Sequence, residues 1–417
     1  MSIDLTSQLK KSFSPEILDI INMAGEIARD CGFPLYMVGG VVRDIMLGRR
    51  NLDLDLVVEG DAIQLATLLS KTSRGKILVY PQFGTAKFRC PHITLDFATA
   101  RSETYSQPGA LPTVSPGSIE QDLLRRDFSI NAMAIALDID HLGELIDPCG
   151  GERDLNDAVI RVLHGQSFID DATRILRGIR YEQRLDFHIE PITQGLMMRD
   201  AAMLATMSGA RIRRELELIF DENKPEKPLK RAEELGVITY IFPLLRVNDG
   251  VLSKLQGDRH RGLPVPHAVC FSLLAHGLSQ DDGDAFVKRL KFNKEISRAV
   301  KDTIKLVEQL SFFHDPLAPS DVYERLRDYS NHAILTCALL SESKIAIDHL
   351  YLYLDRLQNV KTILDGEALK QMGVPPGQVL GEALWELLRV RLDGKVETRQ
   401  EEEAWMSLWI RDHALGG

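Results

Sequence analysis

The chain has 417 residues and a mass of 46.8 kDa, which is too long for one ordinary hydrophobic core and suits two to four smaller ones. Its 44% hydrophobic and 26% charged residues exclude a fibrous or wholly disordered protein. No run of about 18 uncharged apolar residues occurs, and the N-terminal sequence MSIDLTSQLKKSFSPEIL has no apolar core, so we expect neither a membrane span nor a signal peptide. The five cysteines are scattered without a CxxC pair, which favours a reducing cytoplasm over a disulfide framework or a structural zinc site.

The net charge of -10 comes from 50 Lys and Arg against 60 Asp and Glu. It argues mildly against nucleic-acid binding, because proteins dominated by phosphate contacts are usually basic. A total does not describe distribution, however, and one basic face can coexist with an acidic remainder. Composition therefore leaves the partner open, and it predicts no oligomeric state.

In chain order, the head region begins with a strand–turn–helix–strand pattern. Leu35–Val38 is a short apolar run that predicts a strand ending at Gly39-Gly40, and Val41–Leu47 predicts the start of a helix. Leu52–Val58 alternates apolar and acidic residues with the period of a strand.

Two further strands, Thr85–Cys90 and His92–Phe97, are predicted on either side of Pro91. From about Ser167 onward the periodicity is helical and is punctuated by glycine and proline clusters. The sequence therefore predicts an α+β protein, with a small α/β head followed by a long all-helical body and tail.

The strongest chemical signal is the acidic pair on the predicted strand Leu52–Val58. Asp53 and Asp55 lie two residues apart, so both carboxylates project from one face, while Leu52, Leu54 and Leu56 are expected to face the core. Adjacent carboxylates repel each other unless a cation shares them, and hard oxygen ligands suit magnesium bound together with substrate phosphates. Asp96 is a candidate third carboxylate, although a strand-end aspartate that caps the following segment explains it equally well.

The turn before this strand predicts an anion site. The backbone N–H groups at Gly39 and Gly40 can approach a phosphate closely, at a helix start that favours negative charge. Arg43 lies one turn into that helix and can add a charged contact to the same anion. A lone acidic pair or a lone Gly-Gly usually has no such role, but the two in this order are far less expected by chance.

Two later segments carry paired charges. In Asp122–Asp138, the sequence RRD at Arg125–Asp127 precedes an apolar run that we interpret as helical, with Asn131 one turn further on. In a functional interpretation, Arg126 contacts a phosphate and Asp127 accepts a hydrogen bond from a ribose hydroxyl. In a purely structural interpretation, the segment is a charged helix N-terminus.

The segment Ser167–Phe187 predicts a helix with Ile175, Leu176 and Ile179 on one side. Its other side carries a stripe of aspartates and arginines: Asp170, Asp171, Arg174, Arg177 and Arg180. Such a stripe is either a solvated face with local ion pairs or a row of planar donors that holds a triphosphate and reads a base edge.

Ser102–Gln121, SETYSQPGALPTVSPGSIEQ, holds three prolines and two glycines and has no clear periodicity. A loop of this length inside a compact domain is usually either functional or disordered. The sequence favours neither alternative over the other.

Taken in order, these segments resemble the motifs of the class II tRNA nucleotidyltransferase and bacterial poly(A) polymerase family. The similarity runs through GGVVRD and DLDLV, RRDFSINAMA, DPCGGERDLNDAVIRVLH and IDDATRILRGIRY, and continues in SGARIRRELELIF and, more weakly, in the C-terminal tail. The resemblance implies a polymerase-β-type nucleotidyltransferase head at residues 1–150. It also implies a helical neck that recognises the nucleotide base (151–225), a helical body that binds tRNA (226–320) and a tail that binds tRNA (321–417).

The activity that this resemblance implies is template-independent transfer of CMP and AMP from CTP and ATP to the 3′ end of tRNA, with Mg2+ as the cofactor. Asp53 and Asp55 match the magnesium ligands. Gly40 and Arg43 match triphosphate contacts, and the nucleotide-binding set is matched by Arg126, Asp171, Arg174, Arg177 and Arg180. Asp170 stands where the family usually has glutamate, which puts its expected role in orienting Arg174 in doubt.

The chemistry of the bases agrees with this implication. Cytosine and adenine both present an amino donor beside a ring-nitrogen acceptor, whereas uracil and guanine present the reverse. An aspartate acceptor beside an arginine donor therefore accepts C and A and rejects U and G, since mismatched buried polar groups are costly.

Several alternatives to a CCA-adding enzyme stay open. One alternative is a partial enzyme that adds only A. An enzyme that adds only CC has less support, because CC-only members of the family that the sequence resembles have a shortened loop at this position, whereas Ser102–Gln121 is long. A bacterial poly(A) polymerase is disfavoured because the C-terminal residues Glu401–Gly417 are acidic and apolar instead of basic. A catalytically inactive tRNA-binding protein is disfavoured because both Asp53 and Asp55 are present.

Overall fold

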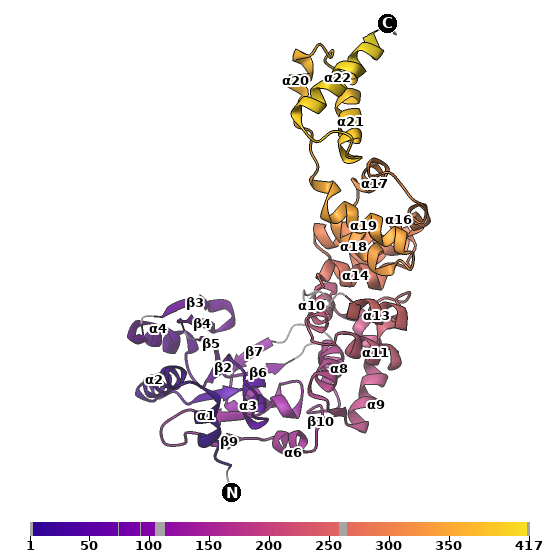
Figure 1. Ribbon diagram of the computed structural model, residues 1–417. Coiled ribbons are helices and arrows are strands. Elements are labelled where there is room, and N and C mark those ends of the chain that lie inside the picture. Colours follow the sequence, from indigo (N-terminus) through magenta and orange to yellow (C-terminus); the bar gives the residue numbers. More distant parts are fainter. Residues whose placement is uncertain (1–2, 74, 92, 105–112, 258–264, 415–417) are drawn as a thin grey trace. The chain divides into compact units, whose positions relative to one another are not determined.

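The computed structural model describes residues 3–73, 75–91, 93–104, 113–257 and 265–414. It divides into two compact units (Figure 1): unit 1 comprises Met1–Glu215 and Glu234–Tyr240, and unit 2 comprises Leu216–Glu233 and Ile241–Gly417. Among the described residues, no helix has the length and apolar character needed to cross a membrane. The described part of the chain is α+β, as the sequence predicts, with its large sheet in unit 1 and helices in unit 2.

Unit 1 is built on a mixed sheet that, within the described residues, has seven strands in the order β3-β4-β5-β2-β1-β8-β9. The pair β2–β5 is parallel and the other neighbours are antiparallel. The strands are β1 (Leu35–Val38), β2 (Asp53–Val58), β3 (Lys76–Tyr80), β4 (Thr85–Arg89), β5 (Thr94–Thr99), β8 (Ala134–Ala136) and β9 (Leu145–Ile146).

Strand β2 confirms the predicted alternation in its central residues. Asp53 and Asp55 are exposed, while Leu54 and Leu56 are fully buried. The prediction for Leu52 is wrong, because Leu52 precedes the strand and is 54% exposed. The strand therefore presents both carboxylates on one face and anchors itself with the leucines on the other.

Helices cover the face of the sheet opposite the carboxylates. Helix α4 (Ala62–Ser73) packs on β3, β4 and β5 and against α2 (Pro15–Cys31), and it covers the buried side chains of Phe88 and Phe97. On the carboxylate side, Ile119 of α5 (Ile119–Leu124) joins the cluster that contains Val38 of β1 and Val57 of β2.

The segment Ser102–Gln121 is more regular than its sequence suggests. Strands β6 (Arg101–Thr104) and β7 (Thr113–Pro116) form an antiparallel ribbon, and α5 then begins with a capping box between Ser118 and Gln121. The ribbon was not predictable because its two short strands pair only with each other. Its PGALP segment lies outside the described residues.

The segment after Asp127 corrects another prediction. Where a helical run is expected, the chain forms the 3-10 turn η2 (Ser129–Asn131) and then strand β8. A second exception is strand β11 (His188–Ile189), which interrupts the helical region and pairs in parallel with β10 (Val159–Ile160).

The remaining helices of unit 1 connect these strands and carry the residues discussed below. They are α1 (Thr6–Ser12), α3 (Gly40–Met46), η1 (Pro81–Phe83), α6 (Gly151–Asn156), α7 (Ser167–Asp170), α8 (Thr173–Leu185), α9 (Pro191–Asp200), η3 (Ala201–Thr206), the N-terminal part of α10 (Gly209–Phe220) and most of α12 (Ile238–Ile241).

Unit 2 is helical throughout its described residues. One core cluster contains Phe313, Leu326 and Leu350, and a second contains Leu387 and Met406. The helices are α11 (Glu226–Glu234), α13 (Asp249–Gly257), α14 (His267–Ala275), α15 (Gln280–Leu290), α16 (Lys294–Glu308), η5 (Leu310–Phe313), α17 (Pro319–Leu326), α18 (Asn331–Leu340), α19 (Lys344–Asp355), η6 (Leu357–Asn359), α20 (Gly366–Gln371), α21 (Gln378–Leu392) and α22 (Arg399–Ala414).

Candidate active site

A cavity of about 780 Å³ in unit 1 gathers most of the predicted site residues. Ten of the twelve line it: Gly39, Gly40, Arg43, Asp53, Asp55, Arg126, Asp127, Asp171, Arg174 and Arg177. Asp96 and Arg180 do not line this cavity. Residues from β2, the turn before α3, the end of α5 and helix α8 thus meet at one place, although they are far apart in sequence.

The carboxylates Asp53 and Asp55 project from β2 toward this cavity. Asp55 is accessible from the cavity, but the protein around its carboxyl removes part of the surrounding water and, together with the charge of Asp53, raises the pKa of Asp55 to about 6. A raised pKa means that the two negative charges are poorly compensated by protein groups. The pair therefore fits a divalent cation, which would supply the missing positive charge.

Asp96 lies beside Asp55 in the register of β2 and β5, as the sequence predicts. Its carboxylate is 2.9 Å from the Nζ of Lys87 on β4. Among the described residues, no group of three or more acidic, histidine or cysteine side chains is spaced to hold a metal. Asp96 is thus paired with Lys87, and Asp53 and Asp55 stay the candidate ligands of a cation.

The turn at Gly39 favours glycine because of its backbone conformation. Its φ is +77°, a conformation that other residues rarely adopt. A Cβ at this position would lie 2.9 Å from Nη1 of Arg126. The turn thus allows the Arg126 guanidinium to approach the backbone at the start of α3, while Asp122 holds the same guanidinium at 2.9 Å.

Arg43 and Asp127 are also held by neighbours. Arg43 is buried and donates hydrogen bonds to Asp44 and, at 2.8 Å, to the Oδ1 of Asn131. Asp127 accepts hydrogen bonds from Nε and Nη2 of Arg177 at 2.8 and 2.6 Å. Burial acts to raise the pKa of Asp127, but the charge of Arg177 and the hydrogen bonds from Arg177 and Asn131 together outweigh it and lower the pKa below its usual value.

The predicted stripe of charges on one exposed helix face is wrong in two respects. Asp170 ends α7 and Asp171 lies in the break before α8, so they do not share a helix with the arginines. Arg174 and Arg180 are only 6% and 4% exposed, so the solvated-face interpretation is also wrong. These arginines are buried because acceptors from other parts of the chain reach them.

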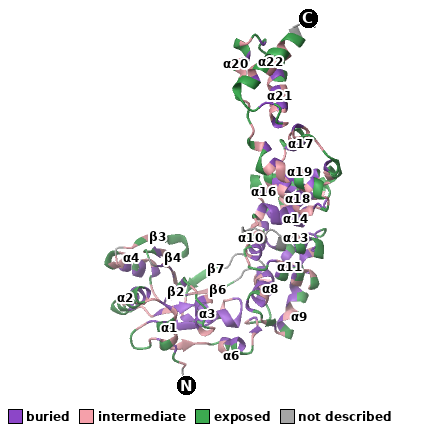
Figure 2. Ribbon diagram, viewed as in Figure 1, coloured by how far each residue is buried: buried purple, intermediate pink, exposed green. Residues whose placement is uncertain are grey.

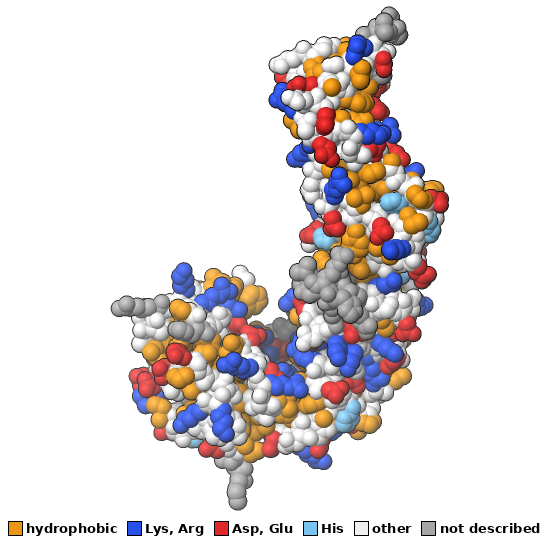
Figure 3. Space-filling view, viewed as in Figure 1, with side chains coloured by type: hydrophobic (Ala, Val, Ile, Leu, Met, Phe, Trp, Pro, Cys, Tyr) orange, Lys and Arg blue, Asp and Glu red, His pale blue; other side chains and the backbone are white. Residues whose placement is uncertain are grey.

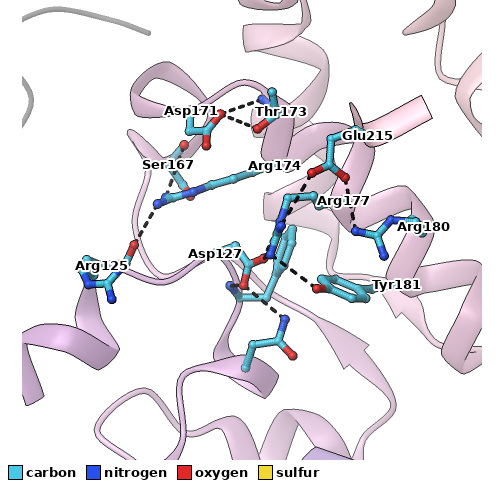
Figure 4. A network of polar contacts seen from close by, with 12 residues as sticks. Arg125, Asp127, Ser167, Asp171, Thr173, Arg174, Arg177, Arg180, Tyr181 and Glu215 are labelled. Atoms are coloured by element: carbon cyan, nitrogen blue, oxygen red, sulfur yellow. Dashed lines mark hydrogen bonds and ion pairs between the residues drawn. The ribbon is translucent and has the colours of Figure 1, made fainter. Parts of the chain in front are cut away.

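Asp171 and Arg174 have separate partners (Figure 4). Asp171 accepts from Nη2 of Arg211 at 2.5 Å and from the hydroxyl of Thr173 at 2.6 Å. Arg174 donates to the Oγ of Ser167 at 2.7 Å and to the backbone carbonyl of Arg125 at 2.8 Å. Both side chains are thus fixed within the cavity lining without bonding to each other.

The expected role of Asp170 is not what the structure shows. Its carboxylate lies 3.9 Å from Nε2 of His164. The guanidinium of Arg174 is instead oriented by Ser167 and Arg125, which the sequence reasoning did not identify.

Helix α10 supplies two functional candidates that the sequence reasoning missed. Glu215 is 7% exposed and lies 3.2 Å from Arg180 and 3.6 Å from Arg177 (Figure 4). Arg211, which holds Asp171, is four residues earlier on the same helix face. The spacing in SGARIRRELELIF could have indicated this pair.

Tyr181 is a further missed residue. The guanidinium carbons of Arg43, Arg177, Arg180 and Arg184 lie 5.0 to 5.9 Å from its ring centroid. Such distances suit cation–π attraction. The ring therefore helps to hold several like-charged side chains close together at the cavity wall.

Comparison with known proteins gives matches along most of the chain. Residues 35–161 match the poly A polymerase head domain, and residues 186–248 match the probable RNA and SrmB-binding site of polymerase A. The A-adding tRNA nucleotidyltransferase of Geobacter sulfurreducens is 33% identical over 91% of this chain, which spans only 45% of that relative. The A-adding tRNA nucleotidyltransferase of Halalkalibacterium halodurans is 31% identical over 96% of this chain and 94% of its own.

A solved structure is similar over almost the whole length. The CCA-adding enzyme of Thermotoga maritima, complexed with tRNA, is 31% identical, with a TM-score of 0.76 over 98% of this chain and 99% of its own. The sequence motifs, the head-domain match and a relative aligned nearly end to end agree with one another. This chain belongs to the tRNA nucleotidyltransferase and poly(A) polymerase family.

Proposed function

We propose that this protein transfers CMP and AMP from CTP and ATP to the 3′ end of tRNA without a nucleic-acid template. The observation that carries the proposal is the single cavity in which two carboxylates face a set of arginines. Carboxylates suit a metal-dependent transfer, and planar guanidinium groups suit a triphosphate and a base edge. The family membership reported above supports the same activity.

The pair Asp53 and Asp55 is our candidate for the cation site. Enzymes of the nucleotidyltransferase family generally use a divalent metal, and two exposed carboxylates with room for phosphate oxygens fit Mg2+. When bound, the ion would lower the pKa of the acceptor 3′-hydroxyl and stabilise charge on the α-phosphate and on departing pyrophosphate.

The other residues orient the nucleotide in this proposal. Gly40, Arg43 and Arg126 contact the triphosphate at the start of α3, where the Gly39 conformation opens the turn. Asp127 fixes Arg177, and an oxygen of Asp127 on the cavity wall accepts from the ribose hydroxyl. Because the arginines are held before substrate arrives, little reorganisation is needed when it binds.

Base selection is assigned to Asp171 and Arg174. Asp171 is an acceptor for the amino group of C or A, and Arg174 is a donor for the adjacent ring nitrogen. Uracil and guanine present the opposite pattern and would leave both groups mismatched, which costs about 1–3 kcal/mol for each buried polar group. The contact from Arg211 keeps Asp171 in the cavity lining, so Arg211 belongs to this selective set.

Each of the four segments of the chain has its own role in this proposal. We assign residues 1–150 to catalysis, 151–225 to base recognition, and 226–320 and 321–417 to tRNA binding. Each of the five cysteines is a free thiol, which supports a reducing cytoplasm as the site of action.

A second candidate is an enzyme that adds only A. It is favoured by the two relatives described above, both of which are A-adding enzymes that align over more than nine-tenths of this chain. Incubation with tRNA ending before CCA and each labelled nucleotide decides between the two. A CCA-adding enzyme incorporates C, whereas an A-adding enzyme incorporates A only on tRNA that already ends in CC.

A further inference from the structure

The face of the sheet that carries Asp53 and Asp55 continues past them onto the edge strands. Residues directly opposite one another on paired strands share a face. Three rows follow from the register of the strands: Asp53, Thr94, Arg89 and Lys76; Asp55, Asp96, Lys87 and Leu78; and Val57, Ala98, Thr85 and Tyr80. The outer ends of these rows, on β3 and β4, are here called the edge face: Lys76, Leu78, Tyr80, Thr85, Lys87 and Arg89.

The edge face is open on the carboxylate side. Helix α4 packs on the other side of β3, β4 and β5, where Phe88 and Phe97 are buried and Val79 of β3 is 39% exposed. Leu78 is 52% and Tyr80 42% exposed, and β3 is drawn as exposed in Figure 2. Leu78 and Tyr80 thus place two apolar side chains side by side on an edge strand, where a binding partner can reach them.

Positive charge accompanies these apolar side chains. Lys76 and Arg89 lie opposite each other and form no ion pair with a described residue, while Lys87 contacts Asp96 at 2.9 Å. Figure 3 shows Lys and Arg interspersed with Asp and Glu over the visible surface. A strip of three cations and an aromatic ring is thus a local feature of a protein whose net charge is -10.

A second cavity connects the edge face to the candidate active site. It has a volume of about 320 Å³, and its lining includes Tyr80, Thr85 and Asp96. Asp55, Arg125 and Arg126 line both this cavity and the larger one. The two cavities therefore adjoin at Asp55.

Nucleotidyl transfer needs two substrates at this point. The attacking and leaving oxygens of a phosphoryl group lie roughly in line, so the acceptor and pyrophosphate must be on opposite sides of the α-phosphate. If the nucleotide fills the arginine-lined cavity, the acceptor hydroxyl arrives from the other one. A single-stranded nucleic acid is bound by cations along its backbone and by aromatic rings under its bases.

We propose that the edge face binds the unpaired 3′ end of the RNA acceptor, an inference that rests on the proposed function. Lys76 and Arg89 contact backbone phosphates, and Tyr80 stacks against a base near the terminus. Leu78 extends the apolar surface between them. The terminal ribose then lies in the smaller cavity beside Asp55, without any of these residues contacting the incoming nucleotide.

The test uses the full chain and two variants of the edge face, Lys76→Gln/Arg89→Gln and Tyr80→Ala, with Tyr80→Phe as the conservative replacement. Lys71→Gln is the matched control, because Lys71 is an exposed cation on α4, which covers the opposite face. For a tRNA transcript ending before CCA, we expect the KM for tRNA to rise about tenfold in both variants. The KM for CTP or ATP should stay unchanged, and Tyr80→Phe should restore the tRNA value.

Binding in the absence of nucleotide locates the contact on the RNA. Removing the unpaired 3′ nucleotides should weaken binding to the wild-type protein but not weaken it further in the edge-face variants. The double variant should also lower the slope of log Kd against log salt concentration by about 1.4, because each of the two lost phosphate contacts contributes about 0.7 to the slope. The proposal is overturned if removing the unpaired nucleotides weakens binding equally in the wild-type protein and in the edge-face variants. It is also overturned if the edge-face variants bind tRNA as tightly as Lys71→Gln.

These readouts keep the inference separate from the proposed function. If the wild-type protein transfers no nucleotide to any tRNA, the proposed function fails. The binding measurements need no turnover, so they still decide whether the edge face holds the RNA 3′ end.

Discussion

Replacing Asp127 by asparagine tests the buried charge pair at the centre of the candidate site. The carboxylate accepts two hydrogen bonds from Arg177, one from Nδ2 of Asn131 at 3.2 Å and one from the backbone N–H of Phe128 at 2.9 Å. The side chain of Asp127 is 8% exposed and that of Arg177 is 34% exposed. Asn at this position keeps the volume but removes the negative charge.

The expected loss of stability follows from this geometry. Breaking a fully buried ion pair costs about 3–5 kcal/mol. Arg177 is one-third exposed and keeps Glu215 at 3.6 Å, so water and Glu215 compensate part of the loss, and we expect about 2–3 kcal/mol. For a unit of this size, that corresponds to a Tm lower by about 5–10 °C.

Calorimetry measures this change, and tryptophan fluorescence separates the units, because Trp385, Trp405 and Trp409 all lie in unit 2. The control is Asp157→Asn, which removes a surface pair with Arg153 whose side chains are 58% and 86% exposed. It should shift Tm by less than about 2 °C. A Tm of Asp127→Asn as high as that of the control would refute the reasoning.

Three further predictions concern nucleotide choice, pH and the β6–β7 ribbon. Arg174→Ala should lower the ratio of kcat/KM for CTP over UTP by about tenfold or more and leave tRNA affinity unchanged; full selectivity with weaker tRNA binding would contradict the assignment. The pKa of Asp55 is raised to about 6, so its carboxylate gains a proton as pH falls through this value and the rate of transfer should decline below about pH 6. Added Mg2+ should move the midpoint of this decline to lower pH. A midpoint that does not depend on Mg2+ would exclude Asp55 as a ligand. Excision of Ser106–Gly117, which removes β7, should sharply reduce A addition to tRNA ending in CC while any C addition survives; undiminished A addition would show that the segment is a passive linker.

Local patterns were sufficient where one segment determines its own structure. The alternation in β2 predicted the shared face of Asp53 and Asp55, and the Gly39-Gly40 turn was predicted between β1 and α3. Both features depend on residues within a few positions of each other. Periodicity alone could not distinguish the short apolar strand β8 from a helix, since such runs suit either.

The contacts that fix the arginines could not be predicted in this way. Arg180 is buried because Glu215 lies beside it, 35 residues later in the chain. Asp171 is held by Arg211, 40 residues away. A helical pattern assigns charged residues to the solvent side, and only a distant partner reverses that assignment.

Incorporation of labelled CTP and ATP into three tRNAs, ending before CCA, after C and after CC, tests the central claim most directly. The wild-type protein should add CMP to the first two and AMP to the third. Asp53→Ala and Asp55→Ala should each lower the rates of all three additions by several orders of magnitude, with little change in folding. AMP addition to the third tRNA alone would establish the A-adding alternative. Near-normal incorporation by the doubly substituted protein would contradict the account, because transfer would then not depend on the carboxylates of β2.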